Sequence, residues 1–555
     1  FGTERLRMVS SLPPLTPRSS GSKPRSLLQH FNLPHPSRRI IIIAFIFVTV
    51  NIVRWNRDLT SSISTPSSLS SSSPSAILAS SSSTPLPVAT AAYAVSITKC
   101  SAKLSSRLYD AAAVLRRSIE LNSYPLHPTS RYAAKFYAFT LKPSDGSHPA
   151  GSDRCYQVLT NAGWEVIPQD PPLYPVLIQE PKGSVLKNGI GSDGCCGHME
   201  LIKLSTYKLV DHDMAVHLDL DTLVVHPFDE IFNVMHFPAN THEGMDAREK
   251  ILEVVAPTYI NRRLTGNPSK SFQSDAAHSK EAAVAELFRN ITVDAYFTKD
   301  YNMIIPGQQN QKVGVQGGFL VVRPSSETYT HLLQLVYSGE FYGGFDAKTS
   351  GWFKSGYGKH IWGAMTIQGL MAYYFDVEQL HHSVELNKCR YNNIADNART
   401  SSFAKNPKFP RCTLLPFVRN PSNSRYNFDD RVCRDGRETC DDTDCQRFPL
   451  KKARVLHYTY CKNPWNCNGC EYLETYKEPT CYEMSREWFK VRSTMVGEGN
   501  RTLDWVTGGR EDGRVSFIRE DGEVELRKGN CLKEFYLGYC QRPGQYDPMI
   551  QRKLG

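Results

Sequence analysis

An apolar segment that ends in two carboxylates constrains the fold of this chain most. Residues 214–218 (Met-Ala-Val-His-Leu) are apolar apart from one histidine, and the run stops at Asp219 and Asp221. The pattern predicts a buried strand that delivers two acids to its carboxyl end, where open α/β sheets bind ligands. Two carboxylates placed in this way can converge on one divalent cation. The same spacing at residues 211–213 and 442–444 lies in polar, turn-like sequence, which predicts solvated acids or helix caps.

Strand and helix patterns alternate before these acids. Strand patterns cover residues 92–98, 135–140, 164–167 and 214–218, and helical patterns cover residues 108–121, 155–162 and 199–209. The alternation predicts an α/β fold, a Rossmann-like and mostly parallel sheet with helices on both faces. Residues 239–298 interrupt it and are interpreted as an insertion, followed by a glycine-opened strand at 313–324 and a helix at 365–375. No glycine-rich phosphate loop of either familiar spacing is present, which disfavours ATP and NAD sites.

The first 92 residues consist of three segments that differ in amino-acid composition. Residues 1–39 are a basic tail, residues 40–55 contain an isoleucine-rich apolar run, and residues 56–92 are dominated by serine. As a helix the apolar run spans roughly 21 Å, less than the roughly 30 Å hydrocarbon core, so a cleaved signal peptide competes with an anchor. Residues 8–39 are rich in Arg and Ser and nearly free of acids, which is also compatible with an organellar transit peptide, but the long isoleucine run argues against it. Because no small-x-small cleavage signature follows closely, we favour a signal anchor and a flexible stalk. This predicts a type II Golgi or ER membrane protein with its head in the lumen.

The net charge of +10 lies largely in that N-terminal tail. The rest of the chain shows no basic stripe interleaved with aromatic residues, so no nucleic-acid partner is expected.

Fifteen cysteines also bear on the compartment. Nine lie in the last third of the chain: Cys389, Cys412, Cys433, Cys440, Cys445, Cys461, Cys467, Cys470 and Cys481. Disulfides and zinc sites are both compatible with this clustering. Residues 467–470 have metal-ligand spacing without a matching second pair, so disulfides in an oxidising lumen are favoured. A further disulfide between Cys531 and Cys540 is predicted, and the glycosylation sequons at Asn290 and Asn500 agree with lumenal exposure.

The order of motifs resembles glycosyltransferase family 8, the glycogenin-like retaining enzymes with a GT-A fold. The similar motifs are the helix Tyr109-Asp-Ala-Ala-Ala-Val-Leu-Arg-Arg-Ser118-Ile119, the pair Lys203-Leu204, the segment Leu218-Asp219-Leu-Asp221-Thr222, the segment Gln316-Gly317-Gly318, Gln368 with Gly369, and His457 followed by Lys462. The resemblance implies a GT-A catalytic domain over residues 93–480. Residues 481–555 form a C-terminal extension that carries no interpretable motif.

The resemblance also implies an activity and a set of site residues. It implies transfer of a hexosyl group, with retention, from a UDP-sugar to a hydroxyl of a glycan or glycoprotein acceptor. Asp219, Asp221 and His457 would bind Mn²⁺, and Gln368 and Lys203 would be catalytic. The donor would be bound by Thr98, Tyr109, Lys203, Gln316, Gly317, Gly318 and Lys462.

Three positions depart from the family pattern. Gln316 stands where an asparagine is usual, Ile367 stands where an aspartate is usual, and Lys462 lies one position early. These departures keep a second hypothesis open, a catalytically impaired relative that binds nucleotide or glycan. A sugar-phosphate nucleotidyltransferase would share the sheet, but it would need a glycine-rich basic loop after the first strand, which this chain lacks.

Overall fold

The computed structural model describes most of the chain after residue 85. The described ranges are 86–98, 105–142, 154–179, 185–266, 277–304, 312–346, 348–398, 433–437, 439–467, 479–495, 540–542, 545–546 and 548–549. All belong to one unit of the chain, residues 84–555. The predicted tail, anchor and most of the stalk lie outside these ranges. Within them, no helix combines the length and the apolar character needed to cross a bilayer.

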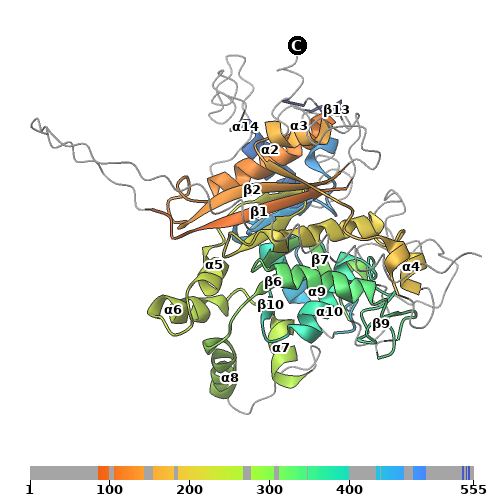
Figure 1. Cartoon of the computed structure of the whole chain (residues 1–555). Helices are drawn as coiled ribbons and strands as arrows, with labels where there is room; N and C mark the ends of the chain where they lie inside the picture. The colour runs from red at the N-terminus through yellow and green to blue at the C-terminus, as the bar shows by residue number, and fades with distance from the viewer. Residues whose placement is uncertain are drawn as a thin grey trace, which may run out of the picture. The chain divides into compact units, whose positions relative to one another are not determined.

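A seven-stranded sheet organises the described residues, in the order β10-β6-β7-β4-β1-β2-β3 (Figure 1). Its strands are β1 Ala89–Ile97, β2 Tyr132–Leu141, β3 Glu165–Gln169, β4 Ala215–Leu218, β6 Ala295–Lys299, β7 Val315–Val322 and β10 Ser383–Glu385. β7 runs antiparallel to its neighbours β4 and β6, and the other pairings are parallel. The predicted mostly parallel α/β sheet is confirmed.

Both faces of the sheet are buried, because alternate side chains of a strand point to opposite faces. Ala92 and Ala94 of β1 join one core, whereas Tyr93 and Val95 join the other. The first core contains residues of η2 Gly197–Lys208, α9 Ser326–Tyr337 and α10 Ile367–Tyr373. The second contains residues of α2 Ser105–Leu121, α3 Arg154–Asn161 and α5 Asp229–His236. The predicted helices on both faces are therefore present (Figure 1).

Shorter elements complete the architecture. The helices are α4 Val185–Gly189, α6 His242–Ile251, α7 Pro257–Thr265, α8 Ala277–Arg289, the π-helix η4 Tyr374–Glu378, α11 Lys388–Tyr391 and α14 Pro479–Ser493. The strands outside the main sheet are β5 Thr222–Val224, β8 Phe341–Tyr342, β9 Gly351–Trp352, β11 Val455–His457, β12 Cys540–Arg542 and β13 Gln545–Tyr546. The remaining one-turn 3₁₀ helices are η1 Pro175–Leu177, η3 Tyr301–Met303, η6 Asp441–Thr443, η7 Leu450–Lys452 and η8 Pro464–Asn466.

Two predicted elements are corrected by the structure. The helix expected at residues 199–209 is η2, a 3₁₀ helix. Leu201, Leu204 and Tyr207 are buried at three-residue intervals, and in a 3₁₀ helix such residues form one row that packs on the sheet. Within the predicted insertion at 239–298, α6–α8 form, but its last residues make the fully buried strand β6 of the main sheet.

Disulfides hold the C-terminal part of the described chain together, as predicted. They join Cys389 to Cys445, Cys433 to Cys440, Cys461 to Cys481, and Cys467 to Cys540. The predicted pairing of Cys531 with Cys540 is wrong, because Cys540 is bonded to Cys467 and β12 is thereby tied to the turn after η8. The same bond removes Cys467 from a metal site at residues 467–470.

The segment after residue 480 packs on the domain through a buried ion pair. Arg492 of α14 contacts Asp110 of α2 at 3.3 Å, and both side chains are almost fully buried. Asp110 also accepts a hydrogen bond from the backbone N–H of Met549 at 3.1 Å. The C-terminal extension therefore contributes directly to the packing of α2.

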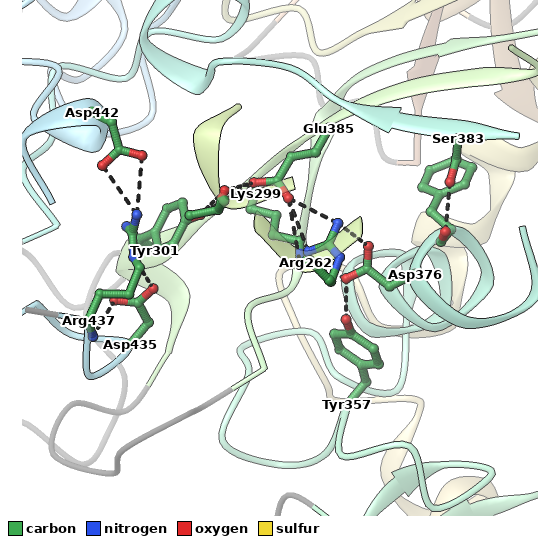
Figure 2. Close-up of polar contacts among 12 residues, drawn as sticks. Arg262, Lys299, Tyr301, Tyr357, Asp376, Ser383, Glu385, Asp435, Arg437 and Asp442 are labelled. Atoms are coloured by element: carbon green, nitrogen blue, oxygen red, sulfur yellow. Dashed lines mark hydrogen bonds and ion pairs between the residues drawn. The ribbon is translucent and has the colours of Figure 1, made fainter. Parts of the chain in front are cut away.

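A second buried network of charges lies between α7 and the β6–β10 edge of the sheet (Figure 2). Asp376 of η4 contacts Arg262 at 2.9 Å and Lys299 at 2.6 Å, and Glu385 contacts Arg262 at 3.3 Å. Burial alone would raise the pKa of Asp376, but the two cations lower it to about 2. This network fixes α7 and η4 against the sheet.

Candidate metal centre

The turn between β4 and β5 presents both acids of the Asp-x-Asp motif. β4 ends at Leu218, and the chain turns back at once into β5. The carbonyl of Asp219 accepts hydrogen bonds from the N–H and the hydroxyl of Thr222, at 3.1 and 2.7 Å. These bonds close the turn, so Asp219 and Asp221 are held on either side of Leu220.

A third side chain, His457, reaches the turn from β11. β11 pairs antiparallel with β5, with His457 opposite Thr222, and the N–H of Tyr458 donates to the carbonyl of Asp221 at 2.8 Å. His457 Nε2 lies 3.3 Å from Asp221 Oδ1. All three possible ligand atoms, one from each residue, lie within 4.8 Å of one another in Asp219, Asp221 and His457. The structure thus brings together all three residues that were predicted to bind metal.

Asn392 orients the histidine. Its side-chain oxygen lies 2.9 Å from His457 Nδ1, and its Nδ2 donates to the Thr298 hydroxyl at 3.0 Å. The nitrogen end of the amide thus faces Thr298, and its oxygen end faces the imidazole. His457 Nδ1 is then the proton donor, and Nε2 faces Asp221. Metal-binding histidines commonly use their second nitrogen in this way.

Lys203 is the cation nearest to the acids. Its ammonium lies 2.8 Å from Asp219 Oδ1 and donates to the carbonyl of Gly317 at 3.2 Å. Lys203 comes from η2, which packs against the sheet, so its charge is held in place. The structure thus places Lys203 beside Asp219, and its predicted role in donor binding and catalysis stays a prediction.

Two glycines of β7 allow the strand to lie against this cluster. A Cβ on Gly318 would lie 2.5 Å from His457 Cε1 and 2.7 Å from Asp219 Oδ2. A Cβ on Gly317 would lie 2.7 Å from Ile367 Cγ2. The side-chain oxygen of Gln316 accepts a hydrogen bond from the N–H of Gly318. The predicted Gln-Gly-Gly segment therefore forms one wall of the cluster.

The cluster perturbs its own ionisable groups. Burial alone would raise the pKa of Asp219, but the charge of Lys203 lowers it below its usual range. Burial alone would lower the pKa of His457, but the adjacent Asp221 carboxylate raises it. A cation that bound here would have to displace the proton that Asp221 favours on His457, so its affinity should fall as the pH falls.

The other predicted site residues lie near the same edge or on neighbouring elements. Gln368 is in the first turn of α10, nine-tenths buried and packed beside Gly363. Thr98 follows β1 directly, and Tyr109 is half-buried on α2. Lys462 lies in the turn after β11 with a φ of 61°. Their roles in binding or catalysis stay predictions.

The chain was compared with known proteins. No protein-family model matches it, and no curated protein matches it. Among solved structures it is similar to the apo form of the WbbM bifunctional glycosyltransferase, with 11% identity, a TM-score of 0.28, and coverage of 72% of this chain and 52% of that one. It is also similar to the glycosyltransferase GlyE of Streptococcus pneumoniae TIGR4, with 12% identity, a TM-score of 0.29, and coverage of 74% and 63%. The chain thus spans between half and two thirds of the length of these structures.

Asp300 is a polar residue near the centre that the sequence analysis did not single out. It follows β6, it is 1% exposed, and its Oδ2 has no hydrogen-bond partner among the described residues. Burial raises its pKa, although the charges of Lys388 and His457 oppose the shift. Its sequence signal was weak, because the run before it, Ala-Tyr-Phe-Thr-Lys, ends in polar residues, unlike the apolar run before Asp219.

The donor set fits a hard divalent cation. Two carboxylates and one imidazole are ligands that Mn²⁺ accepts, and the lack of a side chain at Gly318 keeps β7 from displacing His457 and Asp219. Lys203 adds a fixed positive charge beside the same position. The arrangement can therefore bind a cation and an anionic group together.

Proposed function

We propose that this protein is a retaining glycosyltransferase that moves a hexosyl group from a UDP-sugar to a hydroxyl of a glycan or glycoprotein acceptor. One observation carries the proposal, the convergence of Asp219, Asp221 and His457 at the end of β4. The motif resemblance described above supports the same class of reaction.

In this proposal the difficult step is the departure of the diphosphate from the anomeric carbon. A Mn²⁺ ion held by Asp219, Asp221 and His457 would stabilise negative charge on the diphosphate. Lys203 places a second positive charge beside Asp219 and needs no reorganisation during the reaction. Gly317 and Gly318 let the backbone of β7 lie directly against His457, Asp219 and Ile367, so this strand would border the bound donor. Gln368 is a poor nucleophile, so its carbonyl dipole would stabilise an oxocarbenium-like transition state, and the acceptor would attack from the front face.

We also propose that the head works in the lumen of the Golgi or ER, behind the anchor predicted at residues 40–55. The disulfides of the C-terminal part support this placement, because disulfides persist in oxidising compartments.

A second candidate function is favoured by Ile367. This residue is 1% exposed and lies against Gly317, at the place where the resembling family carries an aspartate. The donor sugar would therefore lack one carboxylate ligand. The corresponding hypothesis is a protein that binds a UDP-sugar without transferring the sugar.

A panel of UDP-sugars with Mn²⁺, assayed for UDP release, separates the two hypotheses. We expect release with at least one donor, and we expect Asp221→Asn to abolish it. Asp211→Asn is the matched control, because Asp211 belongs to an exposed Asp-x-Asp at residues 211–213. UDP binding without turnover of any donor would favour the binding protein, and absence of UDP binding would contradict both hypotheses.

A further inference from the structure

Two adjacent cysteines lie close to the metal centre but outside it. Cys195 and Cys196 carry thiols in the structure, whereas Cys389, Cys461 and Cys467 are examples of cysteines in disulfides. Adjacent Cα atoms are about 3.8 Å apart across a trans peptide, below the roughly 4.4–6.8 Å that disulfides usually require. The two thiols are therefore poorly placed to oxidise to each other.

A carboxylate completes the cluster. The possible ligand atoms, the two sulfurs and one carboxylate oxygen, all lie within 4.8 Å of one another in Cys195, Cys196 and Glu200. In a tetrahedral site with Zn–S distances of about 2.3 Å, neighbouring ligand atoms are roughly 3.8 Å apart. Rotation of the Cys195 side chain, which is exposed, can bring its sulfur closer to the other two ligand atoms.

Glu200 is fixed in a position suited to ligation. It is 8% exposed, it accepts a hydrogen bond from the N–H of Cys195 at 3.2 Å through Oε1, and it accepts one from the hydroxyl of Thr366 at 3.1 Å through Oε2. Each carboxylate oxygen accepts two hydrogen bonds or metal contacts, so both keep a lone pair. Gly194 and Gly197 hold positive φ angles of 68° and 61°, which shapes the turn around the two thiols.

We propose that Cys195, Cys196 and Glu200 bind a thiophilic divalent cation, with Zn²⁺ as the chemically best match, at a site distinct from the Asp219–Asp221–His457 centre. Two thiolates and one carboxylate form a soft donor set that favours zinc, whereas the oxygen and imidazole set of the other centre suits Mn²⁺. The fourth coordination position faces solvent beside Cys195, which also gives the ion its entry path.

Lys203 balances the charge of this second site. Two thiolates and a carboxylate exceed the charge of a dication by one. Without a bound ion, the neighbouring Cys196 thiol and burial raise the pKa of Cys195, and burial raises the pKa of Glu200, whereas the ammonium of Lys203 acts to lower both pKa values. Because Lys203 also contacts Asp219, the two cation sites share one compensating group.

The test uses the full chain, purified without chelators and with the four disulfides of the C-terminal part intact. Cd²⁺ is the probe, because cadmium bound to thiolates gives a charge-transfer absorption that cadmium bound to oxygen and nitrogen does not. We expect one equivalent of Cd²⁺ to produce this band, and one equivalent of Zn²⁺ to displace it and to protect both thiols from alkylation. Mn²⁺ should do neither.

Variants assign the signal to the cluster. Cys195→Ser and Cys196→Ser should each abolish the two-thiolate band, and Glu200→Gln should weaken Zn²⁺ binding at least tenfold. Asp219→Asn serves as the control, since it removes a ligand of the other centre and should leave the band unchanged. Wild-type protein that shows no thiolate band and whose thiols stay reactive in Zn²⁺ would overturn the proposal. The proposal would also fail if mass spectrometry of protein isolated without reductant showed Cys195 bonded to Cys196.

Discussion

Replacement of Gly318 by alanine tests the geometry of the metal centre most sharply. The new Cβ would lie 2.5 Å from His457 Cε1 and 2.7 Å from Asp219 Oδ2, whereas ordinary contacts begin near 3.4 Å. The two side chains would have to retreat by about 0.9 and 0.7 Å, and His457 is 1% exposed, so its retreat would disturb the packed interior. We expect a loss of about 10–100-fold in Mn²⁺ affinity, which corresponds to about 1.4–2.7 kcal/mol.

The assay is a Mn²⁺ titration of the variant, with thermal unfolding as a check on the fold. Overpacking should lower the free energy of unfolding by about 1–3 kcal/mol, which leaves the domain folded for the titration. Gly191→Ala is the matched control, because a Cβ at Gly191 would meet no atom of the described residues within 4 Å apart from its own chain neighbours. Mn²⁺ affinity within twofold of wild type in a folded Gly318→Ala protein would refute the geometry.

Three further predictions follow from individual contacts. Asn392→Ala leaves the buried Nδ1–H of His457 without its acceptor, so we expect about 10-fold or greater loss in Mn²⁺ affinity by titration and a loss of about 1–3 kcal/mol in the free energy of unfolding. Lys203→Met should reduce UDP release about 100-fold or more, because the fixed positive charge beside the metal centre is lost. Mn²⁺ should bind at least as tightly as to wild type, because the ammonium no longer competes for Asp219. A loss of Mn²⁺ affinity in parallel with the loss of UDP release would contradict the assigned role. Burial alone would raise the pKa of Asp376, but its cation partners lower it from 3.8 to about 2, so its charge should contribute about 2 kcal/mol to the free energy of unfolding above pH 4. This contribution should disappear as the pH falls toward 2. Denaturant titrations at several pH values should show that Asp376→Asn removes this part of the acid dependence.

The sequence predicted the parts of the fold that depend on local pattern. Continuous apolar runs identified β4 and β7, and helical spacing identified α2, because burial on the two faces of a sheet selects such patterns. β6 was missed, since its sequence Ala-Tyr-Phe-Thr-Lys carries polar residues at its end and emerges from a polar segment. Its burial depends on β7 and β10, which lie on either side of it.

The candidate metal site likewise contains residues that the local sequence indicated and residues that it did not. Asp219 and Asp221 were evident from a strand that ends in acids, whereas His457 was assigned only through the family resemblance. Nothing local marks Asn392 as the partner of His457, because the pairing depends on how β11 meets the chain after α11. The cluster of Cys195, Cys196 and Glu200 likewise depends on the turn before η2.

The central claim is that Asp219, Asp221 and His457 form one divalent-cation site. Electron paramagnetic resonance of bound Mn²⁺, with detection of nitrogen coupling, tests it most directly. We expect one bound Mn²⁺ with coupling to a single imidazole nitrogen, loss of that coupling in His457→Gln, and weaker binding in Asp221→Asn. Two results would contradict a site made of these three residues: Mn²⁺ that binds the wild-type protein without nitrogen coupling, or Mn²⁺ that binds both variants as tightly as it binds the wild type.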